Sequence, residues 1–348
     1  MNFASDNTGP AHPKVMEALA RANDGHAKAY GADPVTVAAQ ERIREIFEAP
    51  EAAVHFVSTG TAANSLLLAT LSEPWETIFA SEVAHIQEDE CNAPEAFTGG
   101  TKITLLPSSD GRLEPGALRA RIASEQSRGV HGPQRGPVSL TQATEKGAVH
   151  GVHDLAALGA VAKDFGLSVH MDGARFANAL VSLGCTPAEM THGAGVDAVS
   201  FGGTKNGCLA VEAAILFDPA LSWEFELRRK RAAHLFSKHR FLSAQMAAYL
   251  EGDLWLEMAS AANAACARLA AGLRQVPGVS FLAEPQANIV FAHWPRRLHR
   301  KLLAAGATYY VWSGDPSAGD PEEPLLARLV TNWTTTGAEV DRFLSEIT

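Results

Sequence analysis

The chain has 348 residues, of which 46% are hydrophobic and 20% charged, so it can bury at least one full core and is too poor in charge for a disordered or coiled-coil protein. Its 39 acidic and 29 basic side chains give a formal net charge of −10, which argues against a nucleic-acid partner. We find no apolar run of membrane-spanning length, no signal-peptide pattern and no CxxC pair among the four cysteines. We therefore expect a cytoplasmic globular protein without a membrane partner.

Short apolar strands alternate with helical segments over residues 1–240. This alternation predicts an α/β fold with a mostly parallel, seven-stranded type of sheet that is covered by helices. Two helices come first, one beginning at Pro13 and one over 39–47, and two more follow over 62–68 and 155–162. The expected strands are 54–57, 77–80, 103–106, 138–141, 167–171, 198–201 and 213–217.

The pattern changes after about residue 240. An alanine-rich stretch over 241–275 predicts a long helix that ends before Pro277-Gly278. Beyond it, strands and helices alternate again. The expected strands are 279–282, 288–291 and 329–331, and the expected helices are 298–305 and 337–347. We therefore divide the chain into a large domain, residues 1–240, and a smaller C-terminal α/β domain, residues 241–348.

Two strand ends carry residues suited to chemistry. Asp172 stands at the carboxyl end of an apolar strand, where open α/β sheets bind ligands, although an aspartate here also suits the cap of the next helix. Lys205 stands in the glycine-rich run 202–207 after the next strand. A lysine in a crowded pocket has a lowered pKa and can react with an aldehyde, whereas an exposed surface lysine is the ordinary alternative.

A third segment, Ser58-Thr59-Gly60-Thr61, joins a strand to a helix and offers backbone N–H groups and hydroxyls to a phosphate. The chain contains neither a Walker motif nor a GxGxxG fingerprint, which disfavours a nucleotide or NAD site. Pyridoxal phosphate, by contrast, needs a phosphate site, an acid facing its pyridine nitrogen and an amine for its aldehyde. The three segments together indicate that cofactor.

Taken in order along the chain, these segments resemble the threonine aldolases, within the fold type I family of pyridoxal-phosphate enzymes. The resemblance covers nearly the whole sequence. It rests on Ser5-Asp6, Tyr30 to Pro34, Thr59 to Thr61, Ala84-His85, His170 to Arg175 with Asn178, and Arg328 to Thr331. The chain departs from the usual pattern at Asn7 to Gly9, at Thr204 to Asn206 and at 230–245, and at 141–145 it has Thr-Gln-Ala-Thr-Glu for Glu-Asn-Thr-His-Asn. These departures resemble a bacterial subgroup that acts on broad or aromatic substrates.

The resemblance implies pyridoxal 5′-phosphate as the cofactor, bound covalently through Lys205 and contacted by the neighbouring Thr204. It further implies that Asp172 keeps the pyridine nitrogen protonated, that His85 stacks on the ring and that Gly60 and Thr61 bind the phosphate. Arg231 and Lys238 align with basic residues that complete the phosphate site across a dimer. They lie in the basic helical stretch 224–239, which a solvated helix face would also explain.

For the substrate, the resemblance implies that Ser5 and Arg328 bind the α-carboxylate and that Tyr30 reaches the site from a neighbouring subunit. Arg175 would contact either the carboxylate or the cofactor oxygens. The base near the substrate hydroxyl would be His85, His131 or a water. Without the resemblance, His85 would suit a capping or surface position and Arg328 an exposed one. No metal ligand is expected.

The reaction that the resemblance implies is retro-aldol cleavage of L-threonine, allo-threonine or another β-hydroxy-α-amino acid such as phenylserine, giving glycine and an aldehyde. A β-eliminating amino-acid lyase or a serine-hydroxymethyl-transferring relative of the same fold is the first alternative. A non-catalytic cofactor- or amino-acid-binding relative is the alternative from another class. Because the site would include residues of a second subunit, we expect a homodimer or homotetramer with its active sites at the interface.

Overall fold

A computed structural model describes residues 1–348 and places a seven-stranded sheet at the centre of the first part of the chain. The strand order is β1-β7-β6-β5-β4-β2-β3. Six strands run in the same direction, and β7 runs opposite to them. This confirms the predicted fold class. The strands are β1 (Ala53–Val57), β2 (Glu76–Ser81), β3 (Lys102–Leu106), β4 (Gln134–Thr141), β5 (Val169–Gly173), β6 (Ala198–Gly202) and β7 (Glu212–Leu216).

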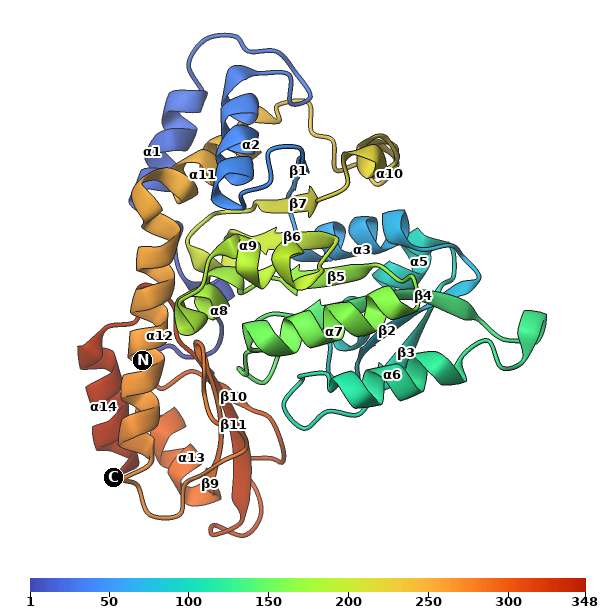
Figure 1. Ribbon diagram of the computed structural model, residues 1–348. Helices are drawn as coiled ribbons and strands as arrows, with labels where there is room; N and C mark the ends of the chain where they lie inside the picture. The colour runs from blue at the N-terminus through green and yellow to red at the C-terminus, as the bar shows by residue number, and fades with distance from the viewer.

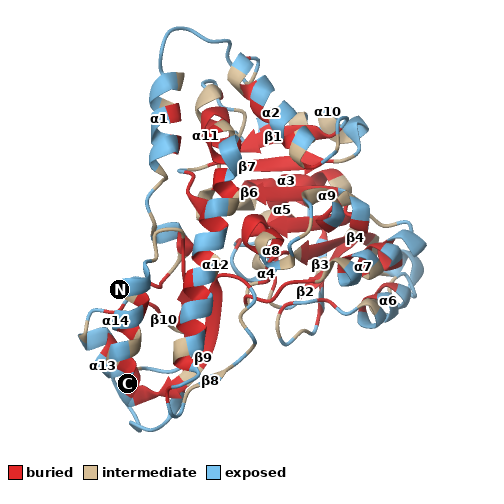
Figure 2. Ribbon diagram, turned by 60° about the vertical axis from the view of Figure 1, so that its left-hand side comes forward, coloured by how far each residue is buried: buried red, intermediate tan, exposed pale blue.

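Helices cover both faces of this sheet, with α7 and α8 on one face and α3 on the other (Figure 1). Figure 2 shows the central strands as buried and the outer sides of α6 and α7 as exposed. The helices of this part are α1 (Pro13–Ala22), α2 (Pro34–Ile46), α3 (Gly60–Leu71), α4 (His85–Glu88), α5 (Ala93–Thr98), α6 (Pro115–Ser124), α7 (Val152–Asp164), α8 (Phe176–Leu183), α9 (Pro187–Met190), α10 (Ser222–Arg231) and α11 (Arg240–Leu250).

The long helix α12 (Leu254–Leu273) runs from the large sheet to a second, four-stranded antiparallel sheet of order β10-β11-β9-β8 (Figure 1). Two further helices cover this smaller sheet. Its elements are β8 (Ser280–Phe281), β9 (Ile289–Pro295), α13 (Arg296–Ala304), β10 (Tyr310–Val311), β11 (Pro324–Val330) and α14 (Gly337–Ile347). None of the helices combines the length and the apolar character needed to cross a bilayer.

Each sheet has its own aromatic core. Beside the large sheet, the ring of Phe201 packs edge-on against Phe176 at 5.4 Å and against Trp255 at 5.5 Å between ring centroids. Beside the small sheet, Phe343 packs against Trp294 and also against Phe3, at 5.2 Å. The N-terminal residues therefore lie against the second sheet, although their sequence position is in the first predicted domain. The predicted division after residue 240 stays a prediction.

Two helical predictions are wrong in extent. The expected single helix over 241–275 is two helices, because the chain turns at Gly252 and Asp253, whose φ angles are +58° and +60°. The basic helix expected over 224–239 ends at Arg231, and irregular chain follows it. At the first break the two residues with positive φ, glycine and aspartate, are poor helix formers, and glycine adopts such a conformation readily.

The ends of β5 and β6 approach each other closely because each ends in glycine. A Cβ atom on Gly173 would lie 2.6 Å from the Ser200 carbonyl oxygen, and one on Gly202 would lie 2.5 Å from that of Ala174. No side chain fits at either position. This approach brings the carboxyl end of β5, which carries Asp172, next to β6, which is followed by the turn that carries Lys205.

Candidate active site

Lys205 stands on a short turn of 3₁₀ helix, η4 (Thr204–Asn206), which follows β6. The turn is fixed on both sides. Thr204 Oγ1 accepts a hydrogen bond from the backbone of Val211 at 3.2 Å, and Asn206 Nδ2 donates to Tyr249 Oη and to the Trp255 carbonyl, each at 2.8 Å. Lys205 itself makes no ion pair. Burial first, and the positive charge of Arg175 second, lower the pKa of its ammonium group.

Asp172 lies at the carboxyl end of β5, as the sequence predicts, and its side chain is buried. Its Oδ1 accepts from the Ala174 backbone at 3.0 Å and its Oδ2 from Asn64 Nδ2 at 2.8 Å. Burial opposes its ionisation, but the nearby charges of His85 and Lys205 outweigh burial and keep the pKa of Asp172 below its ordinary value. The carboxylate form of Asp172 is therefore favoured.

His85 is the first residue of α4, and its Nδ1 lies 2.8 Å from Glu90 Oε1. Glu90 Oε1 also accepts from Asn64 Nδ2 at 2.9 Å, so Asn64 joins Glu90 to Asp172. The hydrogen bond to Glu90 is the main cause that raises the pKa of His85. Ligand atoms of His85, Glu90 and Asp172 lie within 4.8 Å of one another, but the amide and imidazole donors already fill this space with hydrogen bonds.

Arg175 is bound by a partner that the sequence did not suggest. Its Nε and one terminal nitrogen donate to the two carboxylate oxygens of Asp6 at 2.7 and 3.0 Å, and both side chains are buried. Asn288 Nδ2 also donates to Asp6, at 3.1 Å. Most of the guanidinium is therefore used within the protein, and only its remaining nitrogen is left for a ligand.

Arg328, on β11, is different because it has no carboxylate partner. Its nearest polar contact is the Ala4 carbonyl at 3.5 Å, and its guanidinium lies 5.8 Å from the ring centroid of Trp312. Burial, and then the charge of Arg175, lower the pKa of Arg328 to about 10. An unpaired cation in a partly buried position is a ready site for the carboxylate of a ligand.

His85, Arg175, Lys205 and Arg328 line one cavity of about 380 Å³. It lies between loops of the large sheet and residues of the small sheet. The predicted residues Ser5, His85, Arg175, Lys205 and Arg328 all line it. Asp172 lies behind His85 and Lys205 and interacts with both charges. The remaining lining residues include an aromatic wall and several polar side chains, namely Asn7, Val83, Glu88, Asp89, Glu145, Lys146, Phe291, Tyr310 and Trp312.

Gly60 and Thr61 begin α3, whose first turn is capped by Thr59 Oγ1 accepting from the Ala62 backbone at 3.1 Å. A small cavity of about 90 Å³ opens beside this helix end, lined by Thr59, Thr61, Ala62, Leu66, Phe97, Ala232 and His234. The N-terminus of a twelve-residue helix attracts a phosphate. The lining of this small cavity contains no lysine or arginine.

Eight of the thirteen predicted residues are not among those that line this cavity. Asp172, Thr204, Gly60 and Thr61 lie on the elements described above, and the other four are exposed. His131 is exposed in the turn before β4, at the amino end of that strand, whereas the cavity lies at the carboxyl ends. His131 therefore lies at the opposite edge of the sheet from the cavity of its own protomer, and its expected role stays a prediction. Tyr30, Arg231 and Lys238 are exposed on this protomer. Their expected role across a subunit interface stays a prediction.

Sequence reasoning missed Asp6 as a partner, and missed Asn64, Glu90 and Glu145 altogether. Asn64 left one signal, because it and Ser65 are polar residues inside an otherwise apolar helix. Asp6 and Glu145 lie in segments that the sequence comparison had noted, Ser5-Asp6 and 141–145, but neither was given a role. Glu90 left no signal, since its significance arises only from contacts between distant segments.

The sequence profile of the beta-eliminating lyase family matches residues 2–295. The chain belongs to this family. A low specificity L-threonine aldolase from Pseudomonas aeruginosa is 42% identical over 334 residues, covering 96% of this chain and 93% of that protein. Another from Pseudomonas sp. is 40% identical and covers 99% of this chain and 96% of its own length.

Solved structures agree with this family assignment. A structure of Leishmania major threonine aldolase superposes with a TM-score of 0.92 at 28% identity, covering 99% of this chain and 98% of the other. A serine palmitoyltransferase from Sphingomonas wittichii superposes with a TM-score of 0.71 at 17% identity, covering all of this chain and 86% of the other, a likeness of fold alone.

Proposed function

We propose that this protein is a pyridoxal-phosphate-dependent aldolase that cleaves L-threonine, allo-threonine and other β-hydroxy-α-amino acids, including phenylserine, to glycine and an aldehyde. The observation that carries the proposal is the meeting of Lys205, Asp172, His85 and the unpaired Arg328 around one cavity. The two Pseudomonas relatives, each similar along nearly its full length, support the same reaction.

The residues present fit pyridoxal phosphate. Lys205 offers a buried amine without an ion-pair partner, Asp172 a buried carboxylate, and the α3 N-terminus a phosphate site at Gly60 and Thr61. When bound, the cofactor supplies an electron sink for a bond to the substrate Cα that breaks. Because burial lowers the pKa of Lys205, its amine loses its proton more readily and can react with an aldehyde.

Two residues of the chain bind and orient the substrate in this proposal. Arg328 holds the α-carboxylate through its free guanidinium, assisted by Ser5 at the same cavity. The side chain of the amino acid then lies toward the aromatic wall of Phe291, Tyr310 and Trp312. An apolar wall of this kind suits aromatic as well as small substituents, which supports a broad substrate range.

Asp172 and His85 set the charge around the cofactor ring. The surroundings of Asp172 keep its pKa below the ordinary value despite burial, so its carboxylate can hold a ring nitrogen in its protonated form. His85 has its Nδ1 occupied by Glu90, which leaves Nε2 for the bound ring or substrate. Arg175, which is paired with Asp6, is a further polar residue that lines the cavity.

The active assembly in this proposal is a cytoplasmic homodimer or homotetramer with its sites at the subunit interface. The lack of a lysine or arginine in the lining of the small cavity beside the α3 N-terminus supports a second subunit, which would supply Arg231 or Lys238 to the phosphate and Tyr30 to the site. Each of these three residues is exposed on its own protomer. All four cysteines are free, which is in keeping with a reducing compartment.

Product analysis with L-threonine and phenylserine tests the function. An aldolase releases glycine together with acetaldehyde or benzaldehyde. A β-eliminating lyase, which the family profile also covers, instead releases ammonia and a 2-keto acid. Cofactor binding without any turnover would leave a non-catalytic binding protein.

A further inference from the structure

Glu145 is one of the residues that line the cavity, as are Lys205 and Arg328. One of its oxygens is fully used within the protein: Oε1 accepts from the His85 backbone N–H at 2.6 Å and from Thr141 Oγ1 at 3.0 Å. The other oxygen, Oε2, is buried and has no partner. A buried polar atom without a partner is costly, so its presence at a ligand cavity points to a role toward the ligand.

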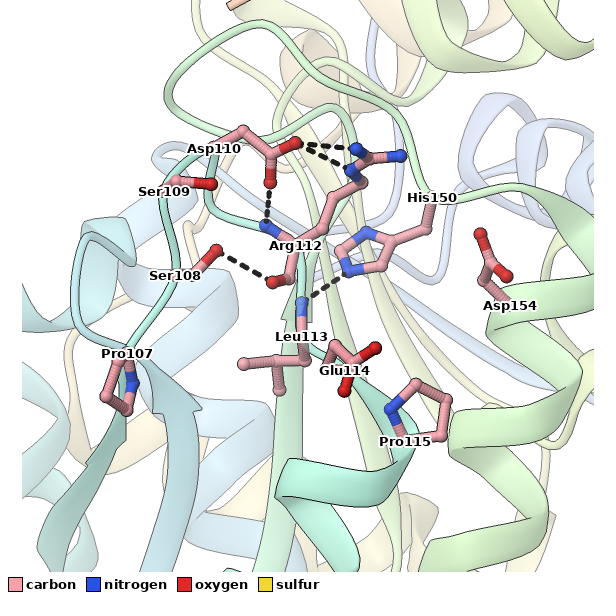
Figure 3. Close-up of a pocket in the computed structure, with 10 residues that line it drawn as sticks. All are labelled: Pro107, Ser108, Ser109, Asp110, Arg112, Leu113, Glu114, Pro115, His150 and Asp154. Atoms are coloured by element: carbon pink, nitrogen blue, oxygen red, sulfur yellow. Dashed lines mark hydrogen bonds and ion pairs between the residues drawn. The ribbon is translucent and has the colours of Figure 1, made fainter.

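The segment that carries Glu145 is rigidly held. Gln142 exchanges two hydrogen bonds with the backbone of His150, at 2.9 and 3.0 Å, and Thr144 Oγ1 donates to the Asp110 carbonyl at 2.6 Å. Asp110 and His150 belong to a second cavity on the far side of this segment. There Asp110 pairs with Arg112 and His150 accepts from the backbone of Leu113 (Figure 3). These contacts fix the carboxyl group in place.

The protonation of Glu145 suits a proton acceptor. Burial, and then the negative charge of Asp172, raise the pKa of Glu145 to about 7. Both the carboxylate and the acid are therefore populated near neutral pH. Because Oε1 already accepts two hydrogen bonds, the proton of the acid form belongs on Oε2.

His85 is less suited to this task than its position suggests. Its Nδ1 is paired with Glu90, and this hydrogen bond raises the pKa of the imidazole. A raised pKa favours the protonated ring, in which both nitrogens donate hydrogen bonds and neither accepts a proton. His131 does not line the cavity in this protomer. Three carboxyl groups do, and Glu145 differs from Glu88 and Asp89, which are exposed, because its free oxygen is buried.

We propose that Glu145 is a catalytic residue that takes the proton of the substrate β-hydroxyl on Oε2. This proposal rests on the proposed aldolase function. The O–H bond breaks and its proton passes to Oε2, while the oxygen electron pair forms the aldehyde C=O bond. The Cα–Cβ bond breaks at the same time, and its electron pair stays with the glycine fragment, which is later protonated at Cα.

The test compares Glu145→Gln with the wild-type holoenzyme. Glutamine keeps an oxygen for the His85 and Thr141 donors but cannot take a proton. We expect kcat for threonine and phenylserine cleavage to fall by roughly 10²- to 10⁴-fold, the usual contribution of a general base. Exchange of the glycine α-proton in deuterated water involves no hydroxyl, so it should continue at a rate near that of wild type.

Infrared difference spectroscopy gives a readout that is independent of turnover. Between mildly acidic and mildly alkaline pH, the wild-type protein should lose the carbonyl bands of protonated carboxyl groups. Glu145→Gln should show a smaller loss that leaves only the change of Glu212, the other carboxyl group whose pKa burial raises to about 7. Thr141→Val serves as a matched variant because it removes one donor that favours the carboxylate. It should move both the infrared midpoint and the acidic limb of kcat/KM to higher pH, by roughly half to one unit.

The outcomes separate the two proposals. If wild type exchanges glycine but cleaves no β-hydroxy amino acid, the proposed function fails. If wild type cleaves and Glu145→Gln cleaves at a similar rate, the role of Glu145 is overturned while the function stands. Equal losses of cleavage and glycine exchange in Glu145→Gln, or a Thr141→Val profile that does not move, would likewise overturn it in favour of a structural role.

Discussion

Asn64 Nδ2 donates a hydrogen bond to Asp172 Oδ2 across 2.8 Å, deep behind the cavity. The same nitrogen donates to Glu90 at 2.9 Å, and Asn64 Oδ1 accepts from Ser200 Oγ at 2.7 Å. The side-chain amide of Asn64 therefore fixes the distance between two carboxylates. One is Asp172 of the cofactor site, and the other is Glu90, which holds His85. Asn64 can be tested as a positioning residue for both.

Replacing Asn64 by Leu removes this donor from two buried carboxylates. A hydrogen bond to a charged group contributes about 1.5–3 kcal/mol, so we expect affinity for pyridoxal phosphate to fall by roughly 10- to 100-fold. Titration of the apoprotein with the cofactor, followed by visible absorbance, measures this change. Ser65→Ala is the matched control, because Ser65 is buried on the same helix and its hydroxyl has no partner. A similar loss in both variants would contradict the role of Asn64.

The Asp6–Arg175 pair predicts a large effect on stability. Asp6→Asn leaves the buried guanidinium of Arg175 without a charged partner, and breaking such a pair typically costs about 3–5 kcal/mol of unfolding free energy. Urea denaturation measures the loss. Asp341→Asn removes an exposed ion pair with Arg268 and should leave the midpoint unchanged, since solvent screens that pair. Equal midpoints for both variants would show that the buried pair contributes little.

Arg328→Lys should weaken substrate binding more than turnover. Lysine keeps the charge but cannot bind a carboxylate through two parallel hydrogen bonds. We expect KM for threonine to rise by roughly tenfold or more, with kcat changed much less. Steady-state kinetics at saturating cofactor separate the two constants, with the exposed Arg297→Lys as control. An unchanged KM would place the carboxylate elsewhere in the cavity.

Stability should fall as the pH falls from about 7 to about 5, and His170 is one identifiable cause. Burial lowers its pKa from 6.5 to about 4, so the folded protein keeps it neutral while the unfolded chain binds a proton. The contribution is thus complete above the unfolded pKa and is lost as pH falls toward 4. For one such histidine the change over this range is about 2 kcal/mol.

Urea denaturation at both pH values checks this effect in a His170→Leu variant, which should show a smaller loss than wild type. His153→Ala is the control, because His153 is 98% exposed. An identical pH dependence in wild type and His170→Leu would mean that His170 is not the titrating group.

Much of the fold and part of the site follow from the sequence alone. Lys205 and Asp172 could be predicted because each follows an apolar strand, and the carboxyl ends of neighbouring parallel strands meet at one edge of the sheet. Gly173 and Gly202, at the ends of these strands, are required because the two strand ends approach each other too closely for a side chain. Local signals of this kind are sufficient where a residue's role depends on the strand that carries it.

Other features could not be predicted because they depend on distant contacts. Glu90 and Asp172 are joined only through Asn64, which lies on a helix on one face of the sheet. The break between α11 and α12 requires positive φ angles at Gly252 and Asp253. The alanine-rich composition of the whole stretch predicts one continuous helix instead. The place of His131 before β4 could not be predicted because its loop could not be aligned without knowing where β4 begins.

The most direct test of the account is to locate the covalent cofactor. The cavity contains two lysines, Lys205 and Lys146, and only Lys205 is expected to bind the aldehyde. Borohydride reduction of the holoenzyme, followed by proteolysis and mass spectrometry, identifies the modified residue. We predict the cofactor on the peptide containing Lys205 and no adduct in a Lys205→Ala variant. A cofactor found on Lys146, or the same adduct in Lys205→Ala, would contradict the central assignment.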